Sequence, residues 1–432
     1  MKGYGEMDRV QRMELLFAIG LAVAFIVYFL VIYFGNLDTE VMRDRFWKNA
    51  DPLFHGEIPV MEYPPFALVF FAIPRIFADT AWGYNAMWVV ETYIFTLIGL
   101  VLVRRIAEGY GVSQVKAMAL YGALMVMFLQ FVADRYDIFP AVMTLGSFYL
   151  IMVKRAPWAF VLLALATLTK VYPALFIPIL MVPYLVDRDW KSMAVGLVAY
   201  AGTGLLVTAV CLLIQPELIT GFLEYHMDRP LEVGCVTATA IYPFSMLGIT
   251  DTWILPATEP GSFGSDDLLG PWPDAVAPFL TPMIAVGTVA LVLFYWYLRR
   301  DEESPEGRVL LVLGAICSVM LIFIVLGKVF SSQYLIWVVP FLALYITVLP
   351  KGACNTRLYY LTLVAFVLTQ VNFTYIYGIT GGGTSINDIA MVSMLVRNLM
   401  VVGMLLLILQ GMVQVRGSNG SFGTRADPVH SD

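Results

Sequence analysis

The residues with the clearest chemical potential in this chain are acidic side chains at the edges of apolar segments. Asp38, Asp44 and Glu62 follow the first long apolar segment, and Asp134 and Asp137 lie in the short stretch "ADRYDIFP". Charged groups are costly to place in apolar surroundings, so those that occur there usually serve a function. A carboxylate in such a place can act as a general base that removes the proton of a hydroxyl group.

Basic side chains accompany these carboxylates. Arg135 stands between the two aspartates, Lys170 lies in "LTKVYP", His226 and Arg229 lie in "YHMDRPLEVG", and Lys328 opens "KVFSSQYLIW". Lys and Arg can hold a phosphate group that leaves with negative charge. The combination suits a reaction in which a hydroxyl is deprotonated and a phosphate departs.

Each of these residues also has a purely structural interpretation. Asp38 can cap a helix or belong to a solvated loop, and residues 134–137 can form a solvated turn with a local ion pair. Lys170 follows about 13 apolar residues and precedes about 16, so it lies below the surface unless its side chain snorkels. His226 can be an ordinary surface residue.

We expect no metal or other cofactor. No tight Asp-x-Asp or His-x-His cluster supports metal binding. Glu91 and Arg397 lie inside apolar segments, where they either pair or face a cavity, and no role follows for them. The cysteines lack metal-ligand or paired spacing and are interpreted as small core residues: Cys211, Cys235, Cys317 and Cys354.

The composition identifies the kind of element that must position these residues. Of 432 residues, 60% are hydrophobic and 13% are charged, and the mean hydropathy is +0.79. A water-soluble domain is about half apolar and about a quarter charged. The apolar residues form blocks of roughly 15 to 25, which predicts a polytopic helical membrane protein. The alternation of a β-barrel is not seen, and nothing resembles a nucleic-acid-binding face.

Block length and flanking polarity predict twelve spans with both termini on one side. The first is interpreted as a span because it is longer than the apolar region of a signal peptide and no cleavage site follows it. The spans are expected near residues 14–34, 84–103, 116–133, 138–153, 157–169, 171–186, 192–214, 278–298, 309–327, 334–349, 358–377 and 386–411.

Lys and Arg test this topology, because cytoplasmic loops carry an excess of both. With cytoplasmic termini, every inner loop has at least one, and the inner segments hold 17 of the 26: Lys2, Arg9, Arg12, Arg104, Arg105, Lys116, Lys154, Arg155, Arg188, Lys191, Arg299, Arg300, Arg308, Lys351, Arg357, Arg416 and Arg425.

The stretch "MEYPPFALVFFAIPRIF", residues 61–77, decides whether this topology holds. If residues 65–77 crossed the membrane, every later loop would change sides and most basic residues would face outward. Thirteen residues give roughly 20 Å of helix, short of the roughly 30 Å hydrocarbon core. We therefore expect a re-entrant or juxtamembrane helix whose N-terminal dipole favours Glu62.

Two predicted outer loops, residues 35–83 and 215–277, are long, and the inner loops are short. The active site is thus expected to face outside the cell. We predict one transmembrane domain over residues 1–413, whose outer loops form the site, and a disordered cytoplasmic tail over residues 414–432. No soluble domain or internal repeat is evident.

Six motifs occur in the order seen in family 87 glycosyltransferases, which this chain resembles from about residue 35 to 345. They are "DTEV", "MEYPPFALVFFAIP", "DRYDIFPAVM", "ATLTKVYPALFIPIL", "YHMDRPLEVG" and "KVFSSQYLIWVVP". The resemblance implies a GT-C-type membrane fold similar to that of polyprenol-phosphate-mannose-dependent mannosyltransferases. The chain departs from the family pattern at Met42, Val233 and Ser332.

The resemblance also implies an activity. It is the inverting transfer of a hexose, typically mannose, from a polyprenyl-phosphate donor to an acceptor hydroxyl of a lipid or glycan on the extracytoplasmic face. In GT-C enzymes the base is an acidic residue just after the first span, which assigns that role to Asp38, with Asp44 in reserve. Lys170, Arg229 and Lys328 are candidates for the donor phosphate. The sugar and acceptor pocket would be shaped by Asp134, Arg135, Asp137, His226, Gln333 and Tyr334.

Two other classes of protein stay open. A secondary transporter would place its ionisable site near the midplane, often between inverted repeats, whereas the charges here favour one face. A GT-C-like ligase or non-catalytic lipid-binding subunit would share the fold without this reaction.

Overall fold

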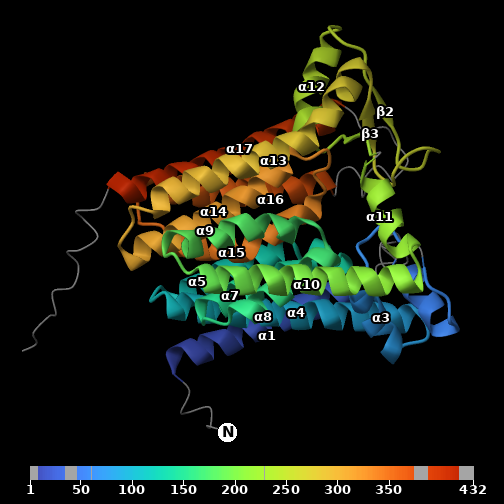
Figure 1. The fold of residues 1–432 in the computed structure, drawn as a ribbon. Helices are drawn as coiled ribbons and strands as arrows, with labels where there is room; N and C mark the ends of the chain where they lie inside the picture. Colours follow the sequence, from blue (N-terminus) through green and yellow to red (C-terminus); the bar gives the residue numbers. More distant parts are fainter. Residues whose placement is uncertain (1–7, 35–45, 60, 228, 374–387, 418–432) are drawn as a thin grey trace, which may run out of the picture.

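The computed structural model describes residues 8–34, 46–59, 61–227, 229–373 and 388–417, and helices dominate it (Figure 1). The α-helices are α1 (Arg9–Phe34), α3 (Ala67–Phe77), α4 (Ala81–Gly109), α5 (Gln114–Met127), α6 (Leu129–Asp134), α7 (Ile138–Met152), α8 (Ala156–Thr169), α9 (Phe176–Val186), α10 (Trp190–Ile214), α11 (Glu217–Met227), α12 (Val236–Met246), α13 (Pro271–Arg299), α14 (Pro305–Leu326), α15 (Leu335–Val348), α16 (Ala353–Phe373) and α17 (Asp388–Gly417). Short 3₁₀ helices are η2 (Asp51–His55), η3 (Tyr172–Leu175) and η4 (Ser332–Tyr334).

The prediction of an all-α polytopic membrane protein is confirmed. Helices lie at all twelve predicted spans, and within the described residues six are long and apolar enough to cross a membrane: α1, α4, α10, α13, α14 and α17. The other helices at predicted spans include α7, α8 and α15, which have 14 or 15 residues. The number of crossings therefore stays a prediction.

The centre of the bundle is formed by α7, α14 and α15, where nearly every side chain is buried. By contrast, α1 and α10 are peripheral and expose large apolar side chains such as Val198, Leu205 and Leu213. In a lipid environment this exposure carries no hydrophobic penalty. The short helices α7 and α15 and the long helix α14 are thus inside, whereas the long apolar helices α1 and α10 are outside.

A small antiparallel sheet with the order β1-β3-β2 lies in the second long loop. Its strands are β1 (Leu231–Glu232), β2 (Trp253–Leu255) and β3 (Asp267–Leu269), and Leu268 pairs with both Leu231 and Ile254. The sheet lies at the same end of the molecule as α3 and α11 (Figure 1).

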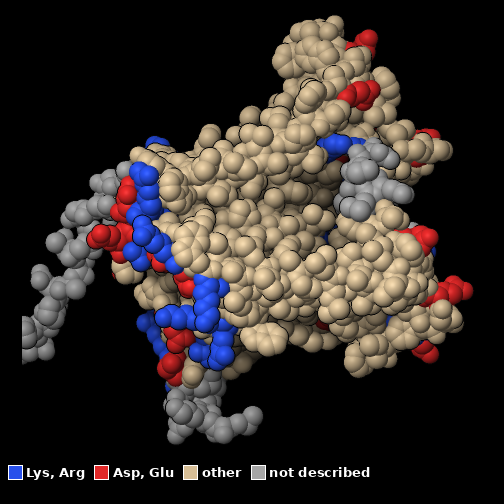
Figure 2. All heavy atoms as spheres, in the orientation of Figure 1, with Lys and Arg blue, Asp and Glu red and all other residues tan. Residues whose placement is uncertain are grey.

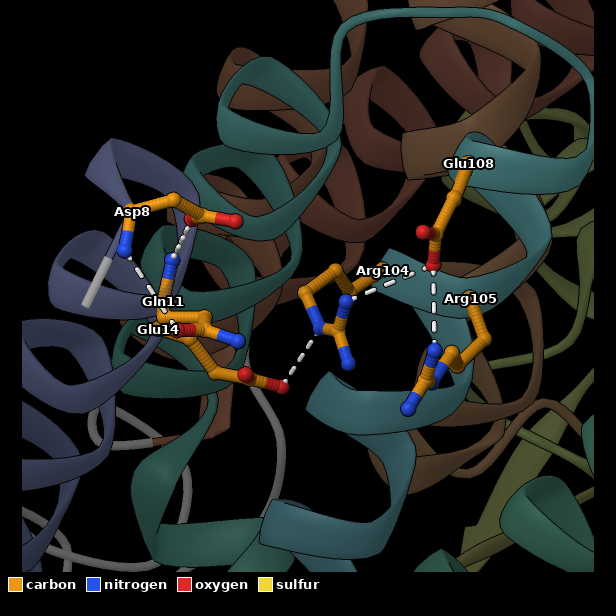
Figure 3. Close-up of polar contacts among 6 residues, drawn as sticks. All are labelled: Asp8, Gln11, Glu14, Arg104, Arg105 and Glu108. Carbon is orange, nitrogen blue, oxygen red and sulfur yellow. Dashed lines mark hydrogen bonds and ion pairs between the residues drawn. The ribbon is translucent and has the colours of Figure 1, made fainter. Parts of the chain in front are cut away.

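Charge separates the two ends of the bundle. Figure 2 shows Lys and Arg gathered at the end where α1 begins and α17 finishes, whereas Asp and Glu dominate the end that carries α3, α11 and the sheet. At the basic end, Arg104 Nε lies 2.8 Å from Glu14 Oε1, and Glu108 accepts from Arg104 and Arg105 (Figure 3). These ion pairs join the start of α1 to the end of α4.

The α3 helix has 11 residues, and its last turn contacts the chain segment that precedes it, which fits the expected re-entrant or juxtamembrane helix. Asp51, which precedes α3, accepts a 2.9 Å hydrogen bond from Nε of Arg75 in its last turn. The same guanidinium lies over the rings of Trp47 and Phe54. The first turn is held in place by a 2.9 Å bond from the N–H of Phe66 to the carbonyl of Leu168 at the end of α8.

One part of the prediction for this segment is wrong. The helix begins at Ala67, five residues after Glu62, so the carboxylate of Glu62 is not in the first turn, where the helix dipole acts. Pro64 and Pro65 precede the helix, and their carbonyls accept hydrogen bonds from the N–H groups of Ala67 and Leu68. The fixed φ angles of these two prolines set the direction in which the chain enters α3, and neither proline needs a partner for a backbone N–H group.

Cysteine labelling can test the return of α3. Glu57 and Asp79 are exposed before and after the helix, so Glu57→Cys and Asp79→Cys are expected to react with an impermeant maleimide from the same side of sealed vesicles. Lys154→Cys, at the exposed turn after α7, is the control and should react from the opposite side. Labelling of residues 57 and 79 from opposite sides would mean that α3 crosses the membrane.

Candidate functional site

The candidate site is centred on an ion pair between two helix ends. α8 ends at Thr169, Lys170 takes an extended backbone conformation, and the chain turns helical again in η3, which starts at Tyr172. Asp137 stands immediately before α7, but its side chain makes no capping bond. The carboxylate is therefore free to reach across to α8, where Lys170 Nζ lies 2.5 Å from Asp137 Oδ1.

Aromatic rings enclose this pair. Trp337 Nε1 donates a 2.7 Å hydrogen bond to Asp137 Oδ1. The Lys170 amine lies 4.5, 5.1 and 5.0 Å from the ring centres of Tyr136, Tyr334 and Trp337. These distances allow cation–π attraction. The amine is thus held by one carboxylate and three rings.

Asp137 keeps unused capacity for a ligand. Its side chain is 1% exposed, and Oδ2 has no hydrogen-bond partner among the described residues. A buried carboxylate oxygen without a partner is unfavourable, so a hydroxyl group of a bound ligand at this oxygen would relieve the cost. The Lys170 side chain is 15% exposed, so the cage is not fully closed.

The cage rings were missed by the sequence analysis, which selected only Tyr334 among them. Tyr172 and Tyr334 both stack on the indole of Trp337, each at a ring-centroid distance of 4.1 Å. A signal was present, because "DRYD", "KVYP" and "QYLIW" each place an aromatic residue next to a candidate. Stacks of this kind orient a side chain more firmly than burial alone.

Two other predicted residues join the same end. Asp134, at the end of α6, accepts a 2.5 Å hydrogen bond from Tyr28 Oη, which ties α1 to the start of the site. Arg135 is half-buried, and its charge lies close enough to act on the Lys170 amine. Asp134 thus has a clear structural function, and Arg135 adds positive charge.

The second long loop contributes Arg229. Its Nη2 donates a 2.9 Å hydrogen bond to Ser265 Oγ, which in turn donates to Asp267 on β3. The charge of Arg229 acts on both Lys170 and Tyr334. Lys328 Nζ donates to the backbone carbonyl of Arg229 at 3.3 Å. Lys328 thus supports the segment that carries Arg229.

Glu232 links this segment to the one after α14. Its Oε2 accepts a 2.6 Å hydrogen bond from the N–H of Phe330, and its own N–H donates to the carbonyl of Lys328. Burial raises the pKa of the Glu232 carboxyl, and the nearby Arg229 guanidinium opposes that rise.

Arg397, for which the sequence suggests no role, braces the same two segments from α17. The side chain is buried, donates a 2.5 Å hydrogen bond to the carbonyl of Gly234, and lies 3.9 Å from the ring centre of Phe330. Asn398 donates to the same carbonyl at 3.1 Å and to Thr239 Oγ1 at 2.8 Å. Arg397 therefore positions the loop that follows Arg229.

The remaining predicted residues have weaker links to the centre. Glu62 is half-buried and acts electrostatically on Tyr136, and Gln333 is half-buried on η4. Asp38 and Asp44 lie outside the described residues. His226 lies on α11, but its side chain is outside the described part of the chain.

Two further observations bear on chemistry at membrane depth. Glu91 on α4 is buried, and neither of its carboxylate oxygens has a hydrogen-bond partner among the described residues. Within the described ranges, no group of three or more His, Cys, Asp or Glu side chains is arranged to hold a metal ion.

The central ion pair predicts a pattern of stabilities. Removing one partner of a buried pair strands the other charge, whereas removing both is often nearly neutral. Lys170→Met or Asp137→Asn alone should therefore lower the free energy of unfolding by about 3 kcal/mol, and K170M/D137N should recover most of that loss. Unfolding in detergent, followed by tryptophan fluorescence, measures the three values.

The matched control for that experiment is Glu108→Gln, which breaks an exposed ion pair at the basic end and should change stability by less than about 1 kcal/mol. A double variant as unstable as the sum of the single variants would contradict the central role of the pair.

The sequence profile of glycosyltransferase family 87 matches residues 62–324, which is more than half of the chain. No curated protein matches. The match includes the segments that carry Glu62, Asp137, Lys170 and Arg229, while Asp38 and the stretch from Lys328 lie outside it. The chain therefore belongs to glycosyltransferase family 87 and is a membrane glycosyltransferase.

Proposed function

We propose that this glycosyltransferase moves a hexose, with mannose as the first candidate, from a polyprenyl-phosphate donor to an acceptor hydroxyl of a lipid or glycan. The observation that carries the proposal is the caged Lys170 amine. It is paired with a carboxylate that has an unused oxygen, and the charges of Arg135 and Arg229 act on it. Such a group of cations suits a phosphate that gains negative charge as its bond to the sugar breaks.

The reaction is a single displacement with inversion. The acceptor oxygen forms a bond to the anomeric carbon while the bond from that carbon to the phosphate oxygen breaks. The proton of the acceptor hydroxyl passes to the general base, and the electron pair of the broken bond leaves with the polyprenyl phosphate. Asp38 is the proposed base, on the strength of the family resemblance, with Asp44 in reserve.

A lipid-linked donor fits the surroundings of Lys170. Val171, the residue after Lys170, is 43% exposed, so an apolar side chain reaches the molecular surface next to Lys170 in the sequence. A phosphate attached to a polyprenyl chain can reach this position without leaving the membrane. The acceptor would approach from the aqueous side, past the second long loop.

The charge distribution supports a direction for the protein in the membrane. Lys and Arg gather at the end opposite to the candidate site (Figure 2), and such an excess is typical of the cytoplasmic side. We infer cytoplasmic termini and a site that faces outside. Nucleotide sugars are confined to the cytoplasm, so a membrane-bound sugar phosphate is the suitable donor there.

The direct test of the activity is transfer from a radiolabelled donor. Purified protein in detergent is mixed with radiolabelled polyprenyl-phosphate mannose and a total lipid extract, and we expect label in a product other than the donor. A matched reaction with labelled polyprenyl-phosphate glucose tests the choice of sugar. No labelled product with either donor, from protein that is folded and binds donor, would contradict the proposal.

Asp38→Asn is expected to lower the transfer rate by at least about 100-fold, because general base catalysis contributes a factor of about 10² to 10⁴. Donor binding should stay within about twofold of the unchanged protein, since the substitution keeps the shape of the side chain. Asp44→Asn is the matched control. Full activity of Asp38→Asn together with loss in Asp44→Asn would transfer the role to Asp44.

Lys170→Met is expected to raise the donor KM by about 10 to 100-fold, since hydrogen bonds to charged groups contribute about 1.5–3 kcal/mol. Comparison with K170M/D137N separates loss of the cation from loss of stability. Lys116→Met is the control at the basic end, where the amine donates to the carbonyl of Ile346. An unchanged donor KM in Lys170→Met would remove this residue from the phosphate site.

A further inference from the structure

The second long loop contains an apolar segment that is unusual for a loop on an aqueous face. Residues 233–250 include no charged side chain, and no Lys or Arg occurs between Arg229 and Arg299. The segment forms α12 and the turn after it. In Figure 1 this helix stands out from the side of the bundle, near α13 and α17.

Large apolar side chains are exposed on the lobe that residues 233–274 form. We define the apolar patch as Phe244, Met246, Leu247, Ile249, Trp253 and Trp272, all of which are at least 40% exposed. Leu247 reaches 74%. The rings of Phe244 and Trp272 lie 5.5 Å apart, so residues from α12 and α13 form one surface. A clustered apolar surface of this kind marks a site of interaction.

The patch continues a surface that already faces lipid. Trp272 lies in the first turn of α13, a helix long and apolar enough to cross the membrane. Seven residues later Phe279 is 64% exposed, and Val286, a further seven residues on, is 70% exposed. Positions seven apart share a face of a helix. The lipid-facing strip of α13 thus runs into the patch without interruption.

Acidic residues mark another side of the lobe. Asp251, Glu259 and Asp274 are exposed, and Figure 2 shows acidic atoms on the side of the lobe away from the bundle, with uncharged atoms on the flank toward it. Because the lobe has no basic residue, attraction to anionic lipid headgroups cannot hold it. Burial of apolar side chains is the available driving force, and Trp suits the interfacial region.

We propose that the apolar patch is a membrane-docking surface that inserts into the lipid leaflet beside α13. The lobe then lies on the leaflet with its acidic side in water. The segment from Arg229 to Gly234 leads directly into α12, and Arg397 donates a hydrogen bond to the carbonyl of Gly234. Insertion of the patch therefore fixes the depth of Arg229 relative to the lipid phosphates, a consequence that rests on the proposed function.

Spin labels on the patch test the docking surface without any assay of activity. Cysteines are introduced singly at Leu247 and Ile249, in a chain with Cys211→Ala and Cys354→Ser. Cys235 and Cys317 are fully buried and stay in place. The matched controls are Val286→Cys, on the lipid-facing strip, and Glu259→Cys, on the acidic side. Each labelled protein is placed as a single copy in a phosphatidylcholine nanodisc.

Collision with oxygen, which concentrates in lipid, is compared with collision with a water-soluble nickel complex. Labels at residues 247 and 249 are expected to resemble the label at residue 286. Their ratio of oxygen accessibility to nickel accessibility should be at least about fivefold higher than the ratio at residue 259. This ratio should stay unchanged in 1 M salt, because salt weakens electrostatic attraction and leaves apolar insertion in place. Nickel accessibility equal to that at residue 259 would mean that water covers the patch. Protection from both reagents would mean that protein covers it. Either result would overturn the proposal.

Discussion

The buried amine of Lys170 must keep a counter-charge next to it. This constraint determines how the helices are arranged at the end of the bundle that carries the candidate site. Lys170 can be charged at this depth only because Asp137 lies 2.5 Å away and aromatic rings surround the amine. The carboxylate can in turn be buried because Lys170 and Trp337 both donate to it. Neither charge would be tolerated alone, so the ends of α7 and α8 and the start of α15 must meet.

This requirement accounts for features that hydropathy alone leaves unexplained. The short helices α7, α8 and α15 lie inside longer ones, and the two 3₁₀ turns after Lys170 and before Leu335 let the chain present aromatic rings to the same point. α3 closes the site from one side, since Phe70 stacks on Phe139 at 4.4 Å and Tyr63 meets Tyr136 at 5.0 Å. The helix α3 thus forms a wall of the site, in addition to the role in topology that the sequence predicts for it.

Much of the fold could be predicted from the sequence because a bilayer restricts the options for a chain. Backbone groups in lipid must be satisfied within helices, so apolar blocks located the helices, and the excess of Lys and Arg located their ends. The length of residues 65–77 predicted a helix too short to cross the membrane, and α3 has 11 residues. The start of that helix was less predictable, because Pro64 and Pro65 are compatible both with a first turn and with the chain that precedes it.

Ionisable candidates could be found one by one, but their partners could not. Asp137 and Trp337 are 200 residues apart in sequence, and Arg397 lies 163 residues from Gly234. No local pattern encodes such contacts. The aromatic cage was missed for the same reason, since an aromatic residue next to a charge has many uses. Asp38 differs from the other ionisable candidates, because its assignment as the base comes from the family resemblance. It also lies outside the described residues.

The short helices also place the site at a particular depth. α8 has 14 residues and so spans about 21 Å, less than the roughly 30 Å hydrocarbon core. If its start is level with the basic end of the longer helices, its other end stops several ångströms inside the membrane. Lys170 then lies below the aqueous surface, where a cation attracts phosphate more strongly than it would in bulk water. The proposed lipid-linked donor would meet this amine from the side, and the proposed polar acceptor would reach it from the water. On the proposed function, two substrates of opposite solubility thus reach one point by separate routes.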